Sequence, residues 1–163
     1  MSEPSSYRIE IAGLTDVGHK RQRNEDDFTV CDLSRGGSGL TPELRDHTLG
    51  PRGTLLAIAD GMGGVPGGAD ASQIAIRTIS EEMLQRAATF SSLSLDAVEQ
   101  LMERAIGTAQ EKVRERSRQN PQQEGMGTTA TLLVVLNGTA VVGFVGDSRA
   151  YRLRDGTLLQ LTQ

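Results

Sequence analysis

Residues 55–68 of this 163-residue chain are Leu55-Leu56-Ala57-Ile58-Ala59-Asp60-Gly61-Met62-Gly63-Gly64-Val65-Pro66-Gly67-Gly68. The first five are apolar without interruption, which predicts a strand covered on both faces of its sheet. Asp60 follows at the rim of the core, where an unpaired charge is costly to bury, and the glycines after it let backbone atoms approach a ligand closely. Carboxylate and carbonyl oxygens are the ligands that hard divalent cations prefer. Asp60 is therefore either a metal ligand or a turn residue that leads into a helix, and this segment favours neither.

The sequence before residue 55 predicts two further strands. Residues 7–14 alternate between apolar and polar side chains, which indicates a half-buried strand. Residues 28–33 indicate a second strand, and the glycine-rich stretch 34–53 predicts a loop. The only two histidines, His19 and His47, belong to no motif, and we expect both at the surface.

The sequence after residue 68 predicts two helices, because apolar residues recur there at spacings of three and four. The stripe of the first helix consists of Ala75, Ile76, Ile79, Met83 and Ala87. The stripe of the second consists of Val98, Leu101, Met102, Ala105, Ala109 and Val113. Ser94 is the expected N-cap of the second helix, with Asp96 in its first turn. We interpret the charged residues 114–118 as a solvated helix end rather than a binding patch.

Beyond Pro121 the pattern changes to hairpins. Strands are expected at 128–136 and 139–145, joined by Asn137-Gly138, and at 148–153 and 157–161, joined by Asp155-Gly156. Helices and antiparallel strands are thus segregated along the chain. This order predicts an α+β fold of stacked layers rather than a doubly wound parallel sheet.

Composition excludes several classes of protein. The length suits one domain. The net charge of −4 argues against nucleic acid as a partner, because phosphate backbones are bound chiefly by Lys and Arg. No apolar run approaches the ~20 residues that cross a bilayer, and the polar start of the chain does not predict a signal peptide. Cys31 is the only cysteine and can form no internal disulfide, so we expect a cytoplasmic protein without membrane contact.

Three further polar clusters could carry chemistry. They lie at residues 16–27, 125–129 and 145–152, each next to an expected strand. Taken singly, the first two are better explained as surface turns, and the third is equally well explained as a hairpin turn. However, Asp147 repeats the placement of Asp60, an acid at the end of an apolar strand. Both side chains could therefore converge at one end of the sheets.

The four clusters together are much more specific than any one of them. Asp-x-Gly-x-x-Arg-x-x-Asn-Glu-Asp at 16–26 is followed by Asp-Gly-Met-Gly-Gly at 60–64, Gly-Thr-Thr at 127–129 and Gly-Asp-Ser-Arg-x-Tyr at 146–151. This series resembles the motifs of bacterial PPM (PP2C-like) serine/threonine protein phosphatases, over nearly the whole chain. The resemblance implies a PP2C-like α-β-β-α sandwich, with two antiparallel sheets flanked by helices. It also implies hydrolysis of phosphoserine and phosphothreonine in proteins, in opposition to a Ser/Thr kinase.

The resemblance assigns expected roles to six residues. Members of the family use two or three Mn²⁺ or Mg²⁺ ions, whose joint charge lowers the pKa of a bound water so that a hydroxide attacks phosphorus. Asp60 is expected to bridge two of these ions, Gly61 to lend a backbone carbonyl, and Asp147 to serve a third ion. Glu25 and Asp26 are expected to hold metal-bound water. Arg21 is expected to bind the substrate phosphate, because its planar fork can grip two oxygens at once.

The chain also departs from the family pattern. Many bacterial relatives have His at the position of Val65 and Glu at that of Ala69, and such a change could alter the leaving-group side of the site or the loop's hold on the helix. This chain ends with Leu161-Thr162-Gln163. In relatives, the matching Leu-Thr pair is followed by further Asp motifs. We therefore expect residues 7–163 to form a partial phosphatase domain without its C-terminal part, after a short polar tail at 1–6. The alternative is a non-catalytic pseudophosphatase that binds a phosphoprotein or a partner domain.

Overall fold

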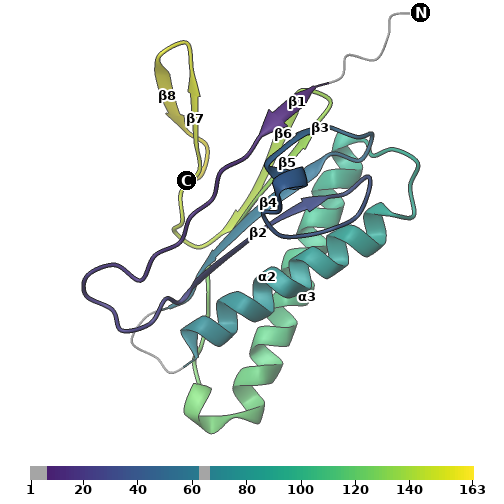
Figure 1. Cartoon of the computed structure of the whole chain (residues 1–163). Coiled ribbons are helices and arrows are strands. Elements are labelled where there is room, and N and C mark those ends of the chain that lie inside the picture. Colours follow the sequence, from purple (N-terminus) through teal and green to yellow (C-terminus); the bar gives the residue numbers. More distant parts are fainter. Residues whose placement is uncertain (1–6, 63–66) are drawn as a thin grey trace, which may run out of the picture.

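A four-stranded antiparallel sheet forms the centre of the molecule. The computed structural model describes residues 7–62 and 67–163. The sheet has the strand order β2-β4-β5-β6, and its strands are β2 (Asp26–Asp32), β4 (Thr54–Asp60), β5 (Ala130–Leu136) and β6 (Thr139–Val145) (Figure 1). The strand predicted at 139–145 is thus confirmed, and the strand predicted at 128–136 is found with a later start, at Ala130. In the register of β2 and β4, Asp26 lies opposite Asp60.

Two long helices cover one face of this sheet. They are α2 (Gly68–Ala87) and α3 (Leu95–Gln119), which pack on each other and on the strands (Figure 1). Both predicted apolar stripes lie in the core. Ser94 caps α3 as predicted, since its hydroxyl accepts a hydrogen bond of 3.2 Å from the Ala97 amide. Within residues 7–62 and 67–163, neither these nor any shorter helix has the length and apolar character to span a membrane.

Strand β4 is covered by helices on one face only, so the prediction of a strand buried on both faces is wrong. Leu55, Ala57 and Ala59 are almost fully buried against the helices, whereas Ile58 on the opposite face is 45% exposed. That face borders a cavity of about 450 Å³ between the sheet and residues 11–15. Both faces of the run are apolar, and its sequence does not distinguish the face that receives the helices.

The segment 34–53 contains a helix and a strand where a loop was predicted. The short helix α1 (Pro42–Arg45) begins with a proline, whose fixed φ suits a first turn. It leads into β3 (Asp46–Thr48), which pairs with β1 (Arg8–Glu10). Arg8 also binds Asp46 through a hydrogen bond of 2.6 Å from Nε to Oδ1. The first strand is therefore shorter than the predicted range 7–14, and its partner could not be found from local pattern.

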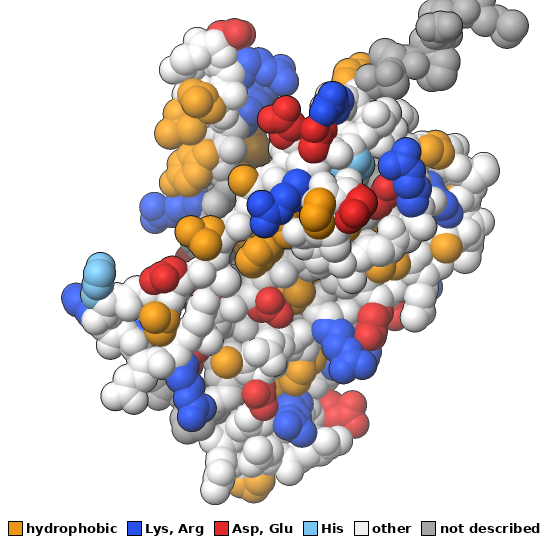
Figure 2. Space-filling model, in the orientation of Figure 1, with side chains coloured by type: hydrophobic (Ala, Val, Ile, Leu, Met, Phe, Trp, Pro, Cys, Tyr) orange, Lys and Arg blue, Asp and Glu red, His pale blue; other side chains and the backbone are white. Residues whose placement is uncertain are grey.

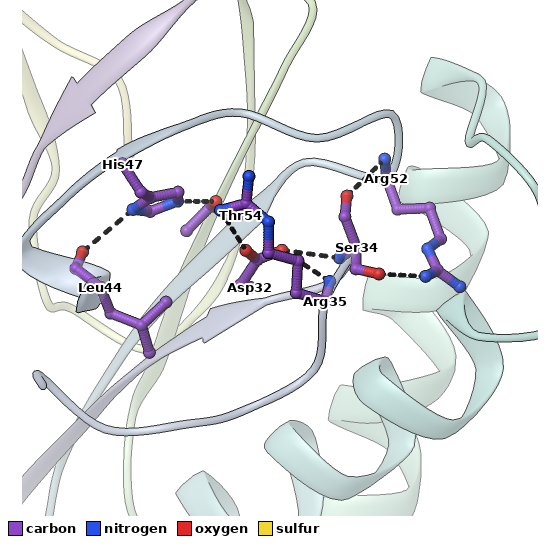
Figure 3. A network of polar contacts seen from close by, with 7 residues as sticks. All are labelled: Asp32, Ser34, Arg35, Leu44, His47, Arg52 and Thr54. Carbon is purple, nitrogen blue, oxygen red and sulfur yellow. Dashed lines mark hydrogen bonds and ion pairs between the residues drawn. The ribbon is translucent and has the colours of Figure 1, made fainter.

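His47 is buried, which contradicts the prediction of a surface position. Burial of its polar ring is tolerated because both ring nitrogens have partners (Figure 3). Nδ1 lies 3.2 Å from the carbonyl oxygen of Leu44, and Nε2 lies 2.8 Å from the hydroxyl of Thr54. His19, by contrast, is exposed as predicted.

A second group in Figure 3 links Asp32, Ser34, Arg35 and Arg52 near the end of β2, and Arg52 also reaches the end of α2. Asp32 is buried and accepts hydrogen bonds from the amides of Ser34 and Arg35. The guanidinium of Arg52 donates to the carbonyl oxygens of Ala87 and Phe90, at 3.3 Å each, and to that of Ser34. The Ala87 carbonyl oxygen also accepts a hydrogen bond of 3.1 Å from the Phe90 amide, so Arg52 adds a side-chain donor at the end of α2.

The chain closes with an exposed hairpin, β7 (Tyr151–Arg154) and β8 (Thr157–Gln160). It projects from the sheet, and apolar side chains gather on it (Figures 1 and 2). Asp155 and Gly156 have φ of 50° and 74°, as Asn137 and Gly138 have 51° and 77°. Positive φ at both central residues is the mark of the predicted two-residue turns. A 3₁₀ turn at Pro121–Gln123 connects α3 towards β5.

Candidate active site

All six residues singled out from the sequence line one cavity of about 310 Å³ at the end of the central sheet. Asp26 begins β2, Asp60 ends β4, and Asp147 follows β6, so neighbouring antiparallel strands bring their ends to the same edge. The loop before β2 supplies Arg21 and Glu25. The complete lining is Asp16, Val17, Arg21, Arg23, Asn24, Glu25, Asp26, Asp60, Gly61, Met62, Thr129 and Asp147.

Negative charge accumulates around Asp60. Partial burial at the strand end raises the pKa of its carboxyl group, and the nearby carboxylates of Asp26 and Asp147 raise it further. The guanidinium of Arg21 opposes this rise but does not cancel it. Repulsion between neighbouring carboxylates disfavours the ionised form, so a cation at this edge would stabilise the ionised cluster.

Gly61 occupies a position that has no room for a side chain. Its amide donates a hydrogen bond of 3.1 Å to the carbonyl oxygen of Glu25. A Cβ atom built on Gly61 would lie 2.3 Å from the carbonyl oxygen of Gly68 and 2.7 Å from that of Glu25. The glycine therefore lets the end of β4 approach the first turn of α2 and the start of β2 at the same time.

The loop that carries Arg21 is held by short polar contacts. Asn24 accepts a hydrogen bond of 3.0 Å from the Asp26 amide through Oδ1, and its amide nitrogen donates to the hydroxyl of Thr15 at 2.7 Å. The side chain of Arg21 is 60% exposed and lies 3.9 Å from the Glu25 carboxylate. Its guanidinium therefore borders the same cavity as the acids while leaving its donors available to a ligand in solution.

Thr129 is a site residue that sequence reasoning did not select. The Gly-Thr-Thr motif, taken singly, is explained as a turn followed by a β-branched run, which assigns no role to Thr129. In the structure the Thr129 hydroxyl accepts a hydrogen bond of 3.0 Å from the Asp60 amide and lies 2.7 Å from the hydroxyl of Ser148. Its place next to the acids depends on a partner 69 residues away, which local pattern does not indicate.

The donor atoms of this edge fit a divalent cation in part. Asp26 and Asp60 face each other as a carboxylate pair, and Gly61 follows directly with its carbonyl, which is the oxygen chemistry that Mg²⁺ and Mn²⁺ accept. Nevertheless, within residues 7–62 and 67–163 no three side chains of His, Cys, Asp or Glu stand close enough together to enclose an ion. An ion at the Asp26–Asp60 pair would therefore need carbonyl oxygens or water as further ligands.

The two departures from the family motifs, Val65 and Ala69, follow the cavity residues Gly61 and Met62 within a few positions of the sequence. Val65 lies outside the described residues. Ala69 is half-buried in the first turn of α2, where its carbonyl oxygen accepts a hydrogen bond of 3.0 Å from the hydroxyl of Ser72. Nothing in these contacts assigns a role to the Ala69 side chain.

Comparison with known proteins gives consistent matches. A family model described as protein phosphatase 2C matches residues 44–163. The serine/threonine phosphatase stp of Listeria welshimeri is 30% identical over 149 residues, covering 91% of this chain and 52% of that protein. The S. agalactiae serine/threonine phosphatase superposes with a TM-score of 0.74 at 28% identity, covering 96% of this chain and 55% of that one. The catalytic domain of PstP, solved in complex with two manganese ions, superposes with a TM-score of 0.67 at 29% identity. This match covers 96% of this chain and 55% of that one.

These matches confirm the fold class predicted from the sequence, a PP2C-like α+β sandwich. They also show that the chain spans about half the length of the relatives it matches.

Proposed function

This chain belongs to the protein phosphatase 2C family, and we propose that its cavity is the phosphate-binding and metal-binding edge of an enzyme that hydrolyses phosphoserine and phosphothreonine in proteins. The observation that carries the proposal is the convergence of all six motif residues on one cavity from three separate segments of the chain. A cationic side chain and several carboxylates on one small cavity suit a phosphate ester together with divalent cations.

Arg21 is the proposed phosphate ligand. Its guanidinium is exposed and borders the cavity from the side of the loop before β2. A guanidinium can donate two parallel hydrogen bonds to phosphate oxygens, which holds the phosphoryl group in one orientation. The charge that develops on these oxygens during transfer is stabilised by the same group.

The carboxylates have the complementary task. Asp60, the Gly61 carbonyl and Asp147 would hold two or three Mn²⁺ or Mg²⁺ ions, and such ions supply a water with a lowered pKa and neutralise phosphoryl charge. The raised pKa of the Asp60 carboxyl group supports this proposal, because a group so placed gains most from a cation nearby. Glu25 and Asp26 border the same cavity, where their oxygens can accept hydrogen bonds from water and fix its orientation.

The substrates and the setting follow as part of the proposal. Phosphorylated proteins produced by a Ser/Thr kinase would be the partners, with residues 7–163 forming part of a single phosphatase domain. The lone, buried Cys31 suits a reducing cytoplasm. Neither nucleic acid nor a membrane is needed for this function.

A second candidate is a non-catalytic module that binds phosphoproteins. It is favoured by one observation: the described residues offer a pair of facing carboxylates but no cluster of three that could enclose an ion. In this case Arg21 would still bind phosphate, while the acids would hold a cation too weakly for turnover.

The two candidates are separated by one set of assays. The first predicts manganese-dependent release of phosphate from a phosphothreonine peptide, lost in Asp60→Asn. The second predicts peptide binding in calorimetry without turnover, lost in Arg21→Ala. Arg104→Ala removes the same charge from an exposed position on α3 and should leave both readouts unchanged. Absence of both turnover and binding would refute both candidates.

A further inference from the structure

Thr129 connects Asp60 to the turn that carries Asp147. On one side, its hydroxyl accepts the Asp60 amide hydrogen at 3.0 Å, and its own amide donates to the Asp60 carbonyl oxygen at 2.9 Å. On the other side, its hydroxyl lies 2.7 Å from that of Ser148, the residue after Asp147. One threonine therefore touches both the end of β4 and the turn after β6.

The methyl group of Thr129 makes a third contact with the same turn. Gly146 has a φ of 97°, and a Cβ atom built on it would lie only 2.7 Å from Cγ2 of Thr129. The backbone of the turn thus rests directly on this methyl group. Because Thr129 is 8% exposed and sits at the entry to β5, it has little freedom to move.

We propose that Thr129 is a positioning residue that sets the separation between the carboxylates of Asp60 and Asp147. This inference rests on the function proposed above, in which both acids serve the same cations. The hydroxyl holds the backbone of Asp60 and the side chain of Ser148, and the methyl group supports Gly146. Groups that orient metal ligands without touching the metal typically change metal affinity by about 10–100-fold when they are removed.

The two halves of the Thr129 side chain can be tested separately. Thr129→Val keeps the shape but removes both hydroxyl contacts, and it leaves the part-buried Asp60 amide without its side-chain acceptor. Thr129→Ser keeps the hydroxyl and loses only the methyl group. Ser148→Ala removes the link to the turn but leaves the bond to Asp60 intact.

Thr131, two residues after Thr129 and within β5, offers a matched control. It is buried like Thr129, but its hydroxyl oxygen has no hydrogen-bond partner among the described residues. Thr131→Val therefore makes the same chemical change two residues later in the chain without removing a hydrogen bond. The Mn²⁺ affinity of Thr131→Val and the exchange rate of its Asp60 amide should equal those of the wild type.

The experiment measures Mn²⁺ binding to the 163-residue chain by calorimetry and hydrogen exchange of the Asp60 amide by NMR. In Thr129→Val we expect Mn²⁺ affinity to fall about 10–100-fold and the Asp60 amide to exchange faster. Thr129→Ser should recover most of both. In Ser148→Ala the affinity should fall while Asp60 exchange stays at the wild-type rate.

Each outcome decides one question. Wild-type affinity in both Thr129→Val and Ser148→Ala would overturn the positioning role and leave the proposed function standing. If the wild-type chain itself binds no Mn²⁺, the metal-dependent function fails for this chain, and the positioning role is then judged from the relaxation of the Asp147 amide. Faster motion of that amide in Thr129→Val supports the role, and unchanged motion refutes it.

Discussion

The close contact at Gly61 allows a sharp prediction. In Gly61→Ala the new methyl group would meet two atoms of Gly68 at 2.3 and 2.6 Å and the carbonyl oxygen of Glu25 at 2.7 Å. All three are backbone atoms, which cannot rotate away as a flexible side chain can. Overpacking of a well-packed region costs about 1–3 kcal/mol, and we expect a loss of unfolding free energy in the upper part of this range. The displacement would also separate the end of β4 from α2 and weaken Mn²⁺ binding.

Gly107→Ala is the matched control for this variant. Gly107 lies within α3, and a Cβ atom built on it meets nothing within 4 Å. Replacing a glycine in a helix interior by alanine stabilises by about 0.5–1 kcal/mol. Urea unfolding followed by circular dichroism should therefore move the two midpoints in opposite directions. A Gly61→Ala midpoint at or above that of the wild type would refute the packing described at this edge.

Three further predictions concern charge and helix ends. The pKa of the Asp60 carboxyl group is raised in the folded chain, so the folded state favours the protonated carboxyl. The stability that this preference contributes is fully present below the ordinary carboxyl pKa of about 3.9. It is lost as pH rises through the raised pKa of the folded chain. Without divalent ions, Asp60→Asn should thus have a higher unfolding free energy than the wild type at pH 7 in urea titrations. This difference in unfolding free energy should vanish towards pH 4. An equal difference at both pH values would contradict the prediction. Arg52→Ala removes hydrogen bonds to the end of α2 and should cost about 1.5–3 kcal/mol in the same assay, whereas an unchanged midpoint would show that water replaces them. Ser94→Ala removes the N-cap of α3 and should cost about 1 kcal/mol, with Ser91→Ala, which is exposed and makes no described side-chain hydrogen bond, as its control.

Much of the architecture could be predicted from local pattern. Both helices, the Ser94 cap and the hairpin turns at Asn137-Gly138 and Asp155-Gly156 agree with the structure. These features depend on residues within a few positions of one another, through helical spacing, capping and positive φ. The acids at strand ends could be found for the same reason, since an apolar run that ends in a charge marks the rim of a core.

Contacts between distant segments had to come from the tertiary structure. His47 is buried because β3 pairs with β1 and faces Thr54 of β4, although nothing next to it in sequence indicates burial. Likewise, β4 is apolar on both sides, and only the packing of α2 and α3 decides which side is covered. Thr129 illustrates the same limit within the site, because its partners lie 69 residues before it and 19 after it.

The sequence by itself determined which residues could serve phosphate and metal chemistry, because the motifs specify residue types at strand ends. Whether Arg21, Asp60 and Asp147 share one cavity was decided by the register and order of the strands, which bring the ends of β2, β4 and β6 to one edge. That arrangement arises from hydrogen bonds between strands and from burial against the helices. Apart from the hairpin of β5 and β6, the strand pairings join residues far apart in the chain, and local sequence does not specify which strands become neighbours.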